Sequence, residues 1–226
     1  MNICIIPARG GSEGIKDKNI YPLLGKPLIQ WTIEQAQYSK KIDEIFVTTD
    51  SSSIKKISQS LGAKTIDRPE EISGALSSSE SALKHALKQI SEILKKDIKN
   101  VIFLQATSPL RLKEDIDNAI DLFERNKADS LFSSSRMEDL TVWQNKNENW
   151  ESINFDYLNR GRRQDIETNY IENGSIYIFK PNILYENNNR LGGKIESYIM
   201  NSWQYHEIDV IEDLEIVEFF LKKYIS

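Results

Sequence analysis

The pattern of apolar and polar residues divides the first 135 positions into alternating strands and helices. Five short runs are predicted as strands, at residues 3–6, 44–50, 63–66, 101–105 and 130–134, and those at 3–6 and 101–105 are apolar enough to be buried. Between them, apolar residues recur at helical intervals in four stretches, at residues 26–36, 51–60, 77–94 and 113–125. This alternation predicts an α/β fold with a doubly wound, mostly parallel sheet that binds ligands at the carboxyl ends of its strands.

The pattern changes after residue 136. Residues 137–172 are polar and carry aromatic side chains without a clear period, so we expect a small arm outside the sheet. Strands are predicted again at 175–179 and 195–200, and an amphipathic helix with Val210, Leu214, Val217 and Leu221 on one side follows them. We therefore expect one α/β domain formed by residues 1–136 and 173–226, with residues 137–172 inserted as the arm.

Composition narrows the class of protein. The 226 residues are 39% hydrophobic and 28% charged, which suits a soluble globular protein, and no apolar run is long enough to cross a membrane. A net charge of -5 argues against general nucleic-acid binding, which needs a broad basic face. The single Cys4 allows no disulfide within the chain, and the first strand begins without a preceding signal peptide, so we expect a cytoplasmic protein.

The loop after the first strand carries the first candidate chemistry. Gly10, Gly11 and Gly14 allow the backbone N–H groups to approach a ligand, and Arg9, Lys16 and Lys18 add positive charge. Glycines alone would indicate a solvated turn, but a strand that leads into a glycine-rich, basic loop is typical of a phosphate site. The loop matches neither the Walker pattern nor the dinucleotide-binding pattern.

Residues 7–12, Pro-Ala-Arg-Gly-Gly-Ser, with Gly14 and Lys18-Asn19 after them, resemble the first signature of the CMP-sugar synthetases, and more narrowly of the acylneuraminate cytidylyltransferases. Residues 104–111, LQATSPLR, are similar to LQPTSPLR in many members, and residues 173–177 are similar to their NGxIY strand. The resemblance covers nearly the whole chain, densely at 5–29 and 101–111 and thinly between 136 and 172.

The resemblance implies a nucleotidyltransferase that joins CTP to a nine-carbon 2-keto sugar acid and releases pyrophosphate. N-acylneuraminate, legionaminate and pseudaminate are the sugar acids to consider, and the resemblance also implies a homodimer built on the arm. CMP-Kdo synthetases carry a metal-binding aspartate just after the glutamine, where this chain has Ala106 and Thr107, so Kdo is disfavoured. In the family, the position of Trp143 can be a lysine that contacts the sugar.

The resemblance also assigns roles to single residues. The catalytic residues would be Arg9, Lys18 and Asp209. CTP would be bound by Ala8, Arg9, Gly10, Gly11, Ser12, Lys16, Lys18, Asn19, Arg68, Gln105, Thr107 and Ser108. The sugar acid would be bound by Gln105, Arg163, Gln164 and Tyr177. Arg68 could instead be a surface charge beside a turn, and Tyr177 a core residue. By their own chemistry, the amide, hydroxyls and arginine that end the 104–111 motif suit hydrogen bonds to a base or a sugar.

Glu207 and Asp209 form the candidate metal site. Side chains two apart on an extended segment point to the same side, so both carboxylates can face one Mg²⁺ ion. Family members usually carry aspartate at both positions. Asp209 also has a structural interpretation, as the N-cap of the final helix in a capping box with Glu212.

Two departures from the family keep two alternatives open. Glu13 stands where members usually have lysine, and Glu207 replaces an aspartate. Both would favour a nucleotide-binding module that has lost catalysis. The other alternative is a sugar-1-phosphate nucleotidyltransferase, which shares a glycine-rich first loop but has a different signature.

Overall fold

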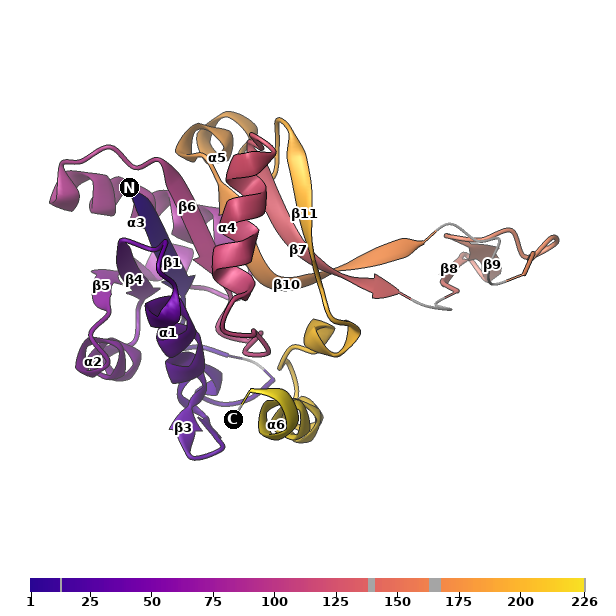
Figure 1. Ribbon diagram of the computed structural model, residues 1–226. Coiled ribbons are helices and arrows are strands. Elements are labelled where there is room, and N and C mark those ends of the chain that lie inside the picture. The colour runs from indigo at the N-terminus through magenta and orange to yellow at the C-terminus, as the bar shows by residue number, and fades with distance from the viewer. Residues whose placement is uncertain (13, 138–140, 163–167, 226) are drawn as a thin grey trace.

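A seven-stranded sheet forms the centre of the molecule in the computed structural model, which describes residues 1–12, 14–137, 141–162 and 168–225 (Figure 1). The strand order is β11-β7-β10-β6-β1-β4-β5. The strands are β1 (Asn2–Pro7), β4 (Glu44–Thr49), β5 (Lys64–Asp67), β6 (Asn100–Leu104), β7 (Ser130–Met137), β10 (Asn169–Phe179) and β11 (Ile195–Met200). Within this sheet β10 runs antiparallel to both neighbours, and the other neighbouring strands are parallel. The predicted mostly parallel α/β fold is confirmed.

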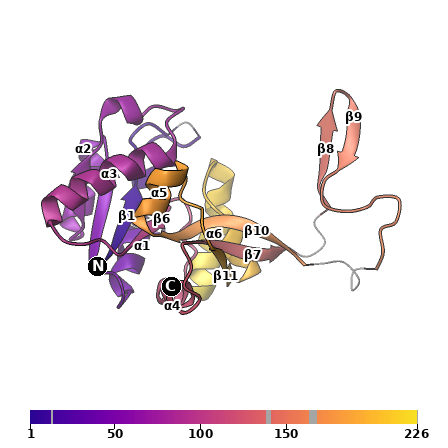
Figure 2. The same ribbon diagram turned by 90° about the horizontal axis from the view of Figure 1, so that it is seen from above.

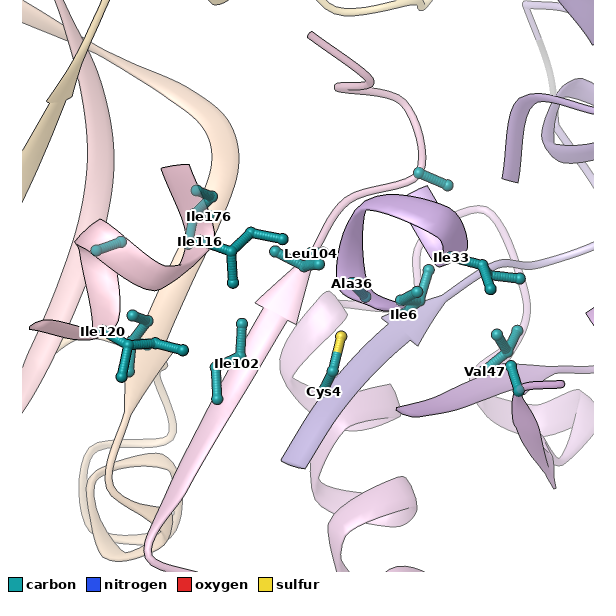
Figure 3. Close-up of a cluster of buried hydrophobic side chains, with 14 of the residues drawn as sticks. Cys4, Ile6, Ile33, Ala36, Val47, Ile102, Leu104, Ile116, Ile120 and Ile176 are labelled. Atoms are coloured by element: carbon teal, nitrogen blue, oxygen red, sulfur yellow. The ribbon is translucent and has the colours of Figure 1, made fainter. Parts of the chain in front are cut away.

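Helices cover both faces of the sheet, because its strands bury side chains on both sides. In β1, Cys4 and Ile6 face the core cluster that contains α1 (Leu28–Tyr38), α2 (Ser52–Ser60) and α4 (Asp115–Arg125). Ile3 and Ile5 alternate with them and face the cluster that contains α3 (Ser79–Leu94) and α5 (Pro181–Asn187). Figure 3 shows the first cluster, in which Ile33 and Ala36 of α1 and Ile116 and Ile120 of α4 surround Cys4, Ile6, Ile102 and Leu104.

A third cluster attaches the last helix to the start of the chain. Leu214, Val217 and Leu221 of α6 (Ile211–Tyr224) are buried with residues of the first loop and of α1. Val210, predicted to share this stripe, is 47% exposed because it lies just before the helix. Shorter elements are the β2–β3 pair (Pro22–Leu23 and Lys26–Pro27) and 3-10 helices at Lys18–Ile20, Glu70–Ile72 and Ser202–Tyr205.

The arm is a continuation of two strands of the sheet. β7 and β10 stay paired from Ser134↔Glu172 to Met137↔Asn169, and the register shifts between Glu172 and Tyr177. A small hairpin, β8 (Trp143–Lys146) with β9 (Asn149–Ser152), lies beyond this stem, away from the sheet (Figures 1 and 2). The strand predicted at 175–179 therefore begins at Asn169, and the predicted limits of the arm fall inside the stem. No helix among the described residues is long and apolar enough to cross a membrane.

Candidate active site

Four segments meet in a cleft of about 570 Å³ at the carboxyl ends of β1 and β6. The first loop contributes Pro7, Arg9, Ser12, Gly14, Lys18 and Asn19, and the second segment contributes Arg68, Ala75 and Ser77–Ser79. The end of β6 contributes Phe103, Gln105, Ala106 and Thr107, and the segment before α6 contributes Glu207 and Asp209. The cleft therefore combines three cations with two carboxylates at the position where a parallel sheet binds its ligands.

Side-chain hydrogen bonds hold the first loop in place. The backbone N–H of Gly10 donates to Asp50 Oδ1 at 2.9 Å. Asn19, which is only 7% exposed, donates Nδ2 to the carbonyl of Arg9 at 3.0 Å. Arg9 donates Nη1 to the carbonyl of Gly74 at 2.8 Å, which joins the loop to the segment before α3. The loop is therefore fixed on both sides before any ligand binds.

Lys18 joins the first loop to the segment that carries the two acids. Its Nζ donates to Asp209 Oδ1 at 2.9 Å and to the carbonyl of Ile208 at 3.0 Å. The Lys18 side chain is 13% exposed, whereas that of Asp209 is 66% exposed. The first loop can come this close to the segment that carries Asp209 only with a glycine at position 14, because a Cβ there would lie 2.2 Å from the backbone oxygen of Asp209. Ile208 is buried, and its N–H donates to the Thr107 carbonyl at 2.8 Å.

Glu207 and Asp209 fit the chemistry of a Mg²⁺ site. The Ser108 hydroxyl lies 3.5 Å from Glu207 Oε2, and burial, reinforced by the nearby Asp209, raises the pKa of Glu207. Mg²⁺ is held in proteins by one or two carboxylates together with substrate phosphates and water. Among the described residues, no group of three or more His, Cys, Asp or Glu could hold a metal ion. A Mg²⁺ ion here would need phosphate oxygens as well.

The predicted capping role of Asp209 is wrong. Helix α6 begins at Ile211, and its first turn is closed by Asp213, whose Oδ2 accepts from the N–H groups of Asp209 and Val210 at 2.8 and 2.9 Å. The carboxylate of Asp213 reaches back to these N–H groups, as the acidic residue of a capping box does. The side chain of Asp209 is therefore available for the cleft, with Oδ1 bound to Lys18.

Arg111 does not lie in the cleft, although the 104–111 motif suggested hydrogen bonds to a ligand. It is fully buried, and its guanidinium donates to Thr32, Gln35, Gln105 and Ser175. Burial lowers its pKa to about 9. The side chain of Gln105 does line the cleft, and its Nε2 donates to the carbonyl of Gly174 at 2.8 Å.

Tyr177 lies beneath the cleft as part of the core. It is 2% exposed and stacks on Phe103, a residue of the cleft wall, with 5.2 Å between the ring centroids. Its hydroxyl donates to Glu172, and burial raises the pKa of that hydroxyl. The guanidinium of Arg190 lies 4.3 Å from the centre of the Tyr177 ring and pairs with Glu80 at 2.6 Å. No sequence pattern pointed to Arg190, which follows a run of asparagines.

The structure brings together nine of the predicted site residues in the cleft wall: Arg9, Ser12, Lys18, Asn19, Arg68, Gln105, Thr107, Glu207 and Asp209. Arg68 is 8% exposed and donates Nε to the carbonyl of Ile72 at 2.8 Å, so it is a buried group rather than a surface charge. The wall does not include Ala8, Gly10, Gly11, Lys16, Ser108 or Tyr177. Glu13, Arg163 and Gln164 lie outside the described residues.

The serines before α3 were missed as site residues. Ser77, Ser78 and Ser79 line the cleft, and the Ser78 hydroxyl accepts from the N–H of Ser81 at 3.2 Å as the N-cap of α3. The first N–H groups of a helix favour anions. A run of serines before an amphipathic helix is a capping signal, so the sequence did contain the information that α3 begins at this point.

Comparisons with known proteins agree on one family. A family model described as "Cytidylyltransferase" matches residues 3–218. The pseudaminic acid cytidylyltransferase of Campylobacter jejuni is 31% identical over 224 residues, covering 98% of this chain and 96% of the relative. The N-acylneuraminate cytidylyltransferase of Escherichia coli is 32% identical over 218 residues, covering 95% of this chain. The chain spans about half the length of that second relative, with 50% covered.

Solved structures agree on the fold. The structure of CMP:2-keto-3-deoxy-manno-octonic acid synthetase complexed with CTP superposes with a TM-score of 0.73 at 16% identity, covering 99% of each chain. That of 4-diphosphocytidyl-2C-methyl-D-erythritol synthase superposes with a TM-score of 0.72 at 12% identity, covering 97% of each chain.

Proposed function

The chain belongs to the cytidylyltransferase family, and we propose that it joins CTP to a nine-carbon 2-keto sugar acid, giving a CMP-sugar and pyrophosphate. The observation that carries the proposal is the grouping of Arg9, Lys18 and Arg68 with two carboxylates in one cleft. A triphosphate needs the cations, and a phosphate-bound divalent ion needs the acids. Relatives named for N-acylneuraminate and for pseudaminic acid support the class of sugar acid.

The proposed reaction depends on positioning and charge neutralisation. The anomeric hydroxyl of the sugar acid attacks the α-phosphorus of CTP, and pyrophosphate leaves. Arg9 and Lys18 hold phosphate oxygens, and the N-terminus of α3, which lines the same cleft, offers further N–H groups. Because these donors are already fixed by protein contacts, little reorganisation is needed when charge develops.

Glu207 and Asp209 would hold Mg²⁺ against the phosphates. When bound, the ion supplies a Lewis acid that offsets charge on the α-phosphate. Lys18 orients Asp209 through Oδ1, which leaves the second carboxylate oxygen for another ligand. Neither His85 nor His206 lines the cleft, so we do not assign a histidine base.

Arg163 and Gln164 remain the predicted contacts to the sugar acid. A carboxylate is recognised best by a planar, bidentate cation, which only arginine offers. One relative is named for N-acylneuraminate and another for pseudaminic acid, so we propose the class of sugar acid and not one member. We also propose a homodimer in the cytoplasm, a compartment that suits a chain whose one cysteine is buried and unpaired.

One assay tests this function. The protein is incubated with CTP, MgCl₂ and, in separate reactions, N-acetylneuraminate, legionaminate, pseudaminate or a sugar 1-phosphate, and pyrophosphate is measured. We expect release with at least one nine-carbon acid, none without sugar and none after chelation of the metal. Release with the sugar 1-phosphate alone would support the alternative nucleotidyltransferase, and CTP binding without any release would support a non-catalytic module.

A further inference from the structure

Arg111 uses its complete set of donors inside the protein. Nε donates to the carbonyl of Ser175 at 3.2 Å, and Nη2 donates to the carbonyls of Ser175 and Gln105, each at 2.7 Å. Nη1 donates to Thr32 Oγ1 at 3.2 Å and to Gln35 Oε1 at 3.0 Å. These five hydrogen bonds match the five N–H groups of a guanidinium. No donor is left for a ligand, and the side chain is 0% exposed.

A buried arginine of this kind needs a reason. Each acceptor of Arg111 is a neutral oxygen, and the nearby Asp115 acts on the guanidinium electrostatically without forming an ion pair with it. Burying a charge is costly, and apolar residues of similar volume often replace buried ions without loss of stability. The fixed, planar arrangement of its donors is the property that an apolar residue could not supply.

One of the backbone carbonyls held by Arg111 belongs to a residue of the cleft wall, Gln105. Arg111 fixes the backbone carbonyl of Gln105 at the end of β6 and that of Ser175 in β10. Between them, the Gln105 amide donates to the carbonyl of Gly174 at 2.8 Å. Gly174 has φ +66, and a Cβ there would lie 2.5 Å from Gln105 Nε2. One guanidinium therefore fixes both backbone segments that determine where the Gln105 side chain points.

We propose that Arg111 is a positioning residue, which orients Gln105 toward a substrate and makes no substrate contact of its own. Gly174 takes one N–H of Gln105 Nε2, and no described donor binds Oε1, so we expect this oxygen, an acceptor, to be the amide atom that contacts the substrate in the cleft. Its ligand is an N–H or O–H donor, either the amino group of cytosine or a hydroxyl of the sugar acid. This inference rests on the proposed function for the identity of the substrates.

A double-mutant cycle tests the proposal with Arg111→Lys, Gln105→Ala and both together. Lysine keeps the charge but has three donors in place of the planar fork. We expect Arg111→Lys to lower kcat/KM by roughly tenfold to hundredfold, as small misplacements of a contact residue do. In the Gln105→Ala background, Arg111→Lys should change kcat/KM by less than about twofold, because its effect passes through Gln105. An equal loss in both backgrounds would overturn the proposal.

Separate KM measurements and a substitute variant make the result of this cycle decisive. The KM values for CTP and for the sugar acid are measured separately, and the one that rises identifies which substrate Gln105 contacts. If Arg111→Lys does not fold, Thr32→Val replaces it in the cycle. It removes one acceptor of Arg111, together with the 3.5 Å hydrogen bond from Thr32 Oγ1 to the Gln105 carbonyl, with little change in volume.

A measurement that does not depend on turnover tests the positioning role of Arg111 separately from the proposed function. In NMR spectra of the protein, the side-chain amide resonance of Gln105 is identified by its absence from the spectrum of Gln105→Ala. In the wild-type protein we expect it to be shifted and protected from solvent exchange, and in Arg111→Lys to move to the position of a free glutamine. An unchanged resonance would overturn the positioning role. A wild-type protein that releases no pyrophosphate, with the resonance behaving as expected, would instead overturn the function alone.

Discussion

Lys18 is the cation that we expect to contribute most to catalysis. It lies between the first loop and the acids, and its side chain is 13% exposed. Lys18→Met should lower kcat/KM for CTP by about a hundredfold, as the loss of one donor that stabilises developing charge does. The loss of folding stability should stay near 1 kcal/mol, since partly exposed ion pairs contribute little. Rates of pyrophosphate release and thermal melting give the two quantities.

Two other lysines complete this comparison. Lys40 is exposed just after α1 and lies outside the cleft wall. Lys40→Met should therefore leave kcat/KM for CTP within about twofold of the wild type and folding stability within about 0.5 kcal/mol. Lys16→Met tests the sequence-based prediction that Lys16 also holds phosphate. If Lys18→Met proves no more harmful than Lys40→Met, Lys18 has no part in catalysis.

Because Asp209 does not cap α6, a substitution at Asp209 can test metal binding alone. Asp209→Asn removes the charge that would attract Mg²⁺ but leaves the cap of α6, which Asp213 provides. We expect activity to fall at least a hundredfold at ordinary Mg²⁺ concentrations, with a melting temperature within about 2 °C of the wild type. A titration of activity against Mg²⁺ should show a strongly raised half-saturating concentration.

The matched variant for Asp209 is Asp213→Ala. It removes the acceptor of two N–H groups at the helix start, so it should cost about 1 kcal/mol of stability. Its Mg²⁺ dependence should remain that of the wild type. An Asp209→Asn protein with wild-type Mg²⁺ dependence would remove Asp209 from the metal site.

At the scale of elements, the contact between the first loop and the segment before α6 depends on one glycine. Gly14→Ala should push the two segments apart, since its Cβ would lie 2.2 Å from the Asp209 carbonyl oxygen. Gly11→Ala is the control, because a Cβ at Gly11 meets nothing within 4 Å. Both variants keep the backbone N–H, so they differ in steric effect alone. We expect roughly a tenfold or greater loss of kcat/KM for Gly14→Ala and a small effect for Gly11→Ala. Equal activities would show that the contact is dispensable.

The elements that could be predicted from the sequence are those whose signal is local. Continuous apolar runs in β1 and β6 and the stripe of α3 reflect burial that repeats every few residues. The start of β10 was missed, because residues 169–172 are mostly exposed and owe their conformation to pairing with β7. Such pairing joins residues more than thirty positions apart, and no local period reports it.

The same contrast between local signals and distant contacts explains which parts of the candidate site could be predicted from the sequence. The motif around Arg9, Lys18 and Asn19 is contiguous, so its position at a strand end could be predicted from the chain itself. The role of Arg111 could not, because its acceptors come from α1, from Gln105 just after β6 and from β10, and only the fold brings these together. The cap of α6 was misassigned for a smaller reason: the helix starts two residues after Asp209, so Asp213 takes the place predicted for Glu212.

At the scale of the whole molecule, the arm leaves aromatic and aliphatic side chains uncovered. Trp143 contacts Phe155 and Tyr157, with ring centroids 5.3 and 5.4 Å apart, so a small cluster does form within the arm. Even so, Trp150 is 65% exposed and Leu158 81% exposed. Exposed large apolar side chains on a projecting segment favour an interface. This supports the prediction of a two-fold homodimer built on the arm.

The dimer prediction can be tested by placing charge on that surface. We expect the wild-type protein to sediment with twice the chain mass of 26.1 kDa, and the double variant Trp150→Glu, Leu158→Glu to sediment as a single chain. Ile93→Glu is the control, because Ile93 is also an exposed apolar residue, at 59%, and it lies on α3 in the body of the protein. Its mass should stay that of the wild type, since a charge there meets solvent. If the wild-type protein is a single chain at micromolar concentration, or if the arm variant keeps the doubled mass, the arm is not the dimer interface. Should dissociation also lower activity while the melting temperature of the α/β body is unchanged, the arm of one copy would be completing the site of the other.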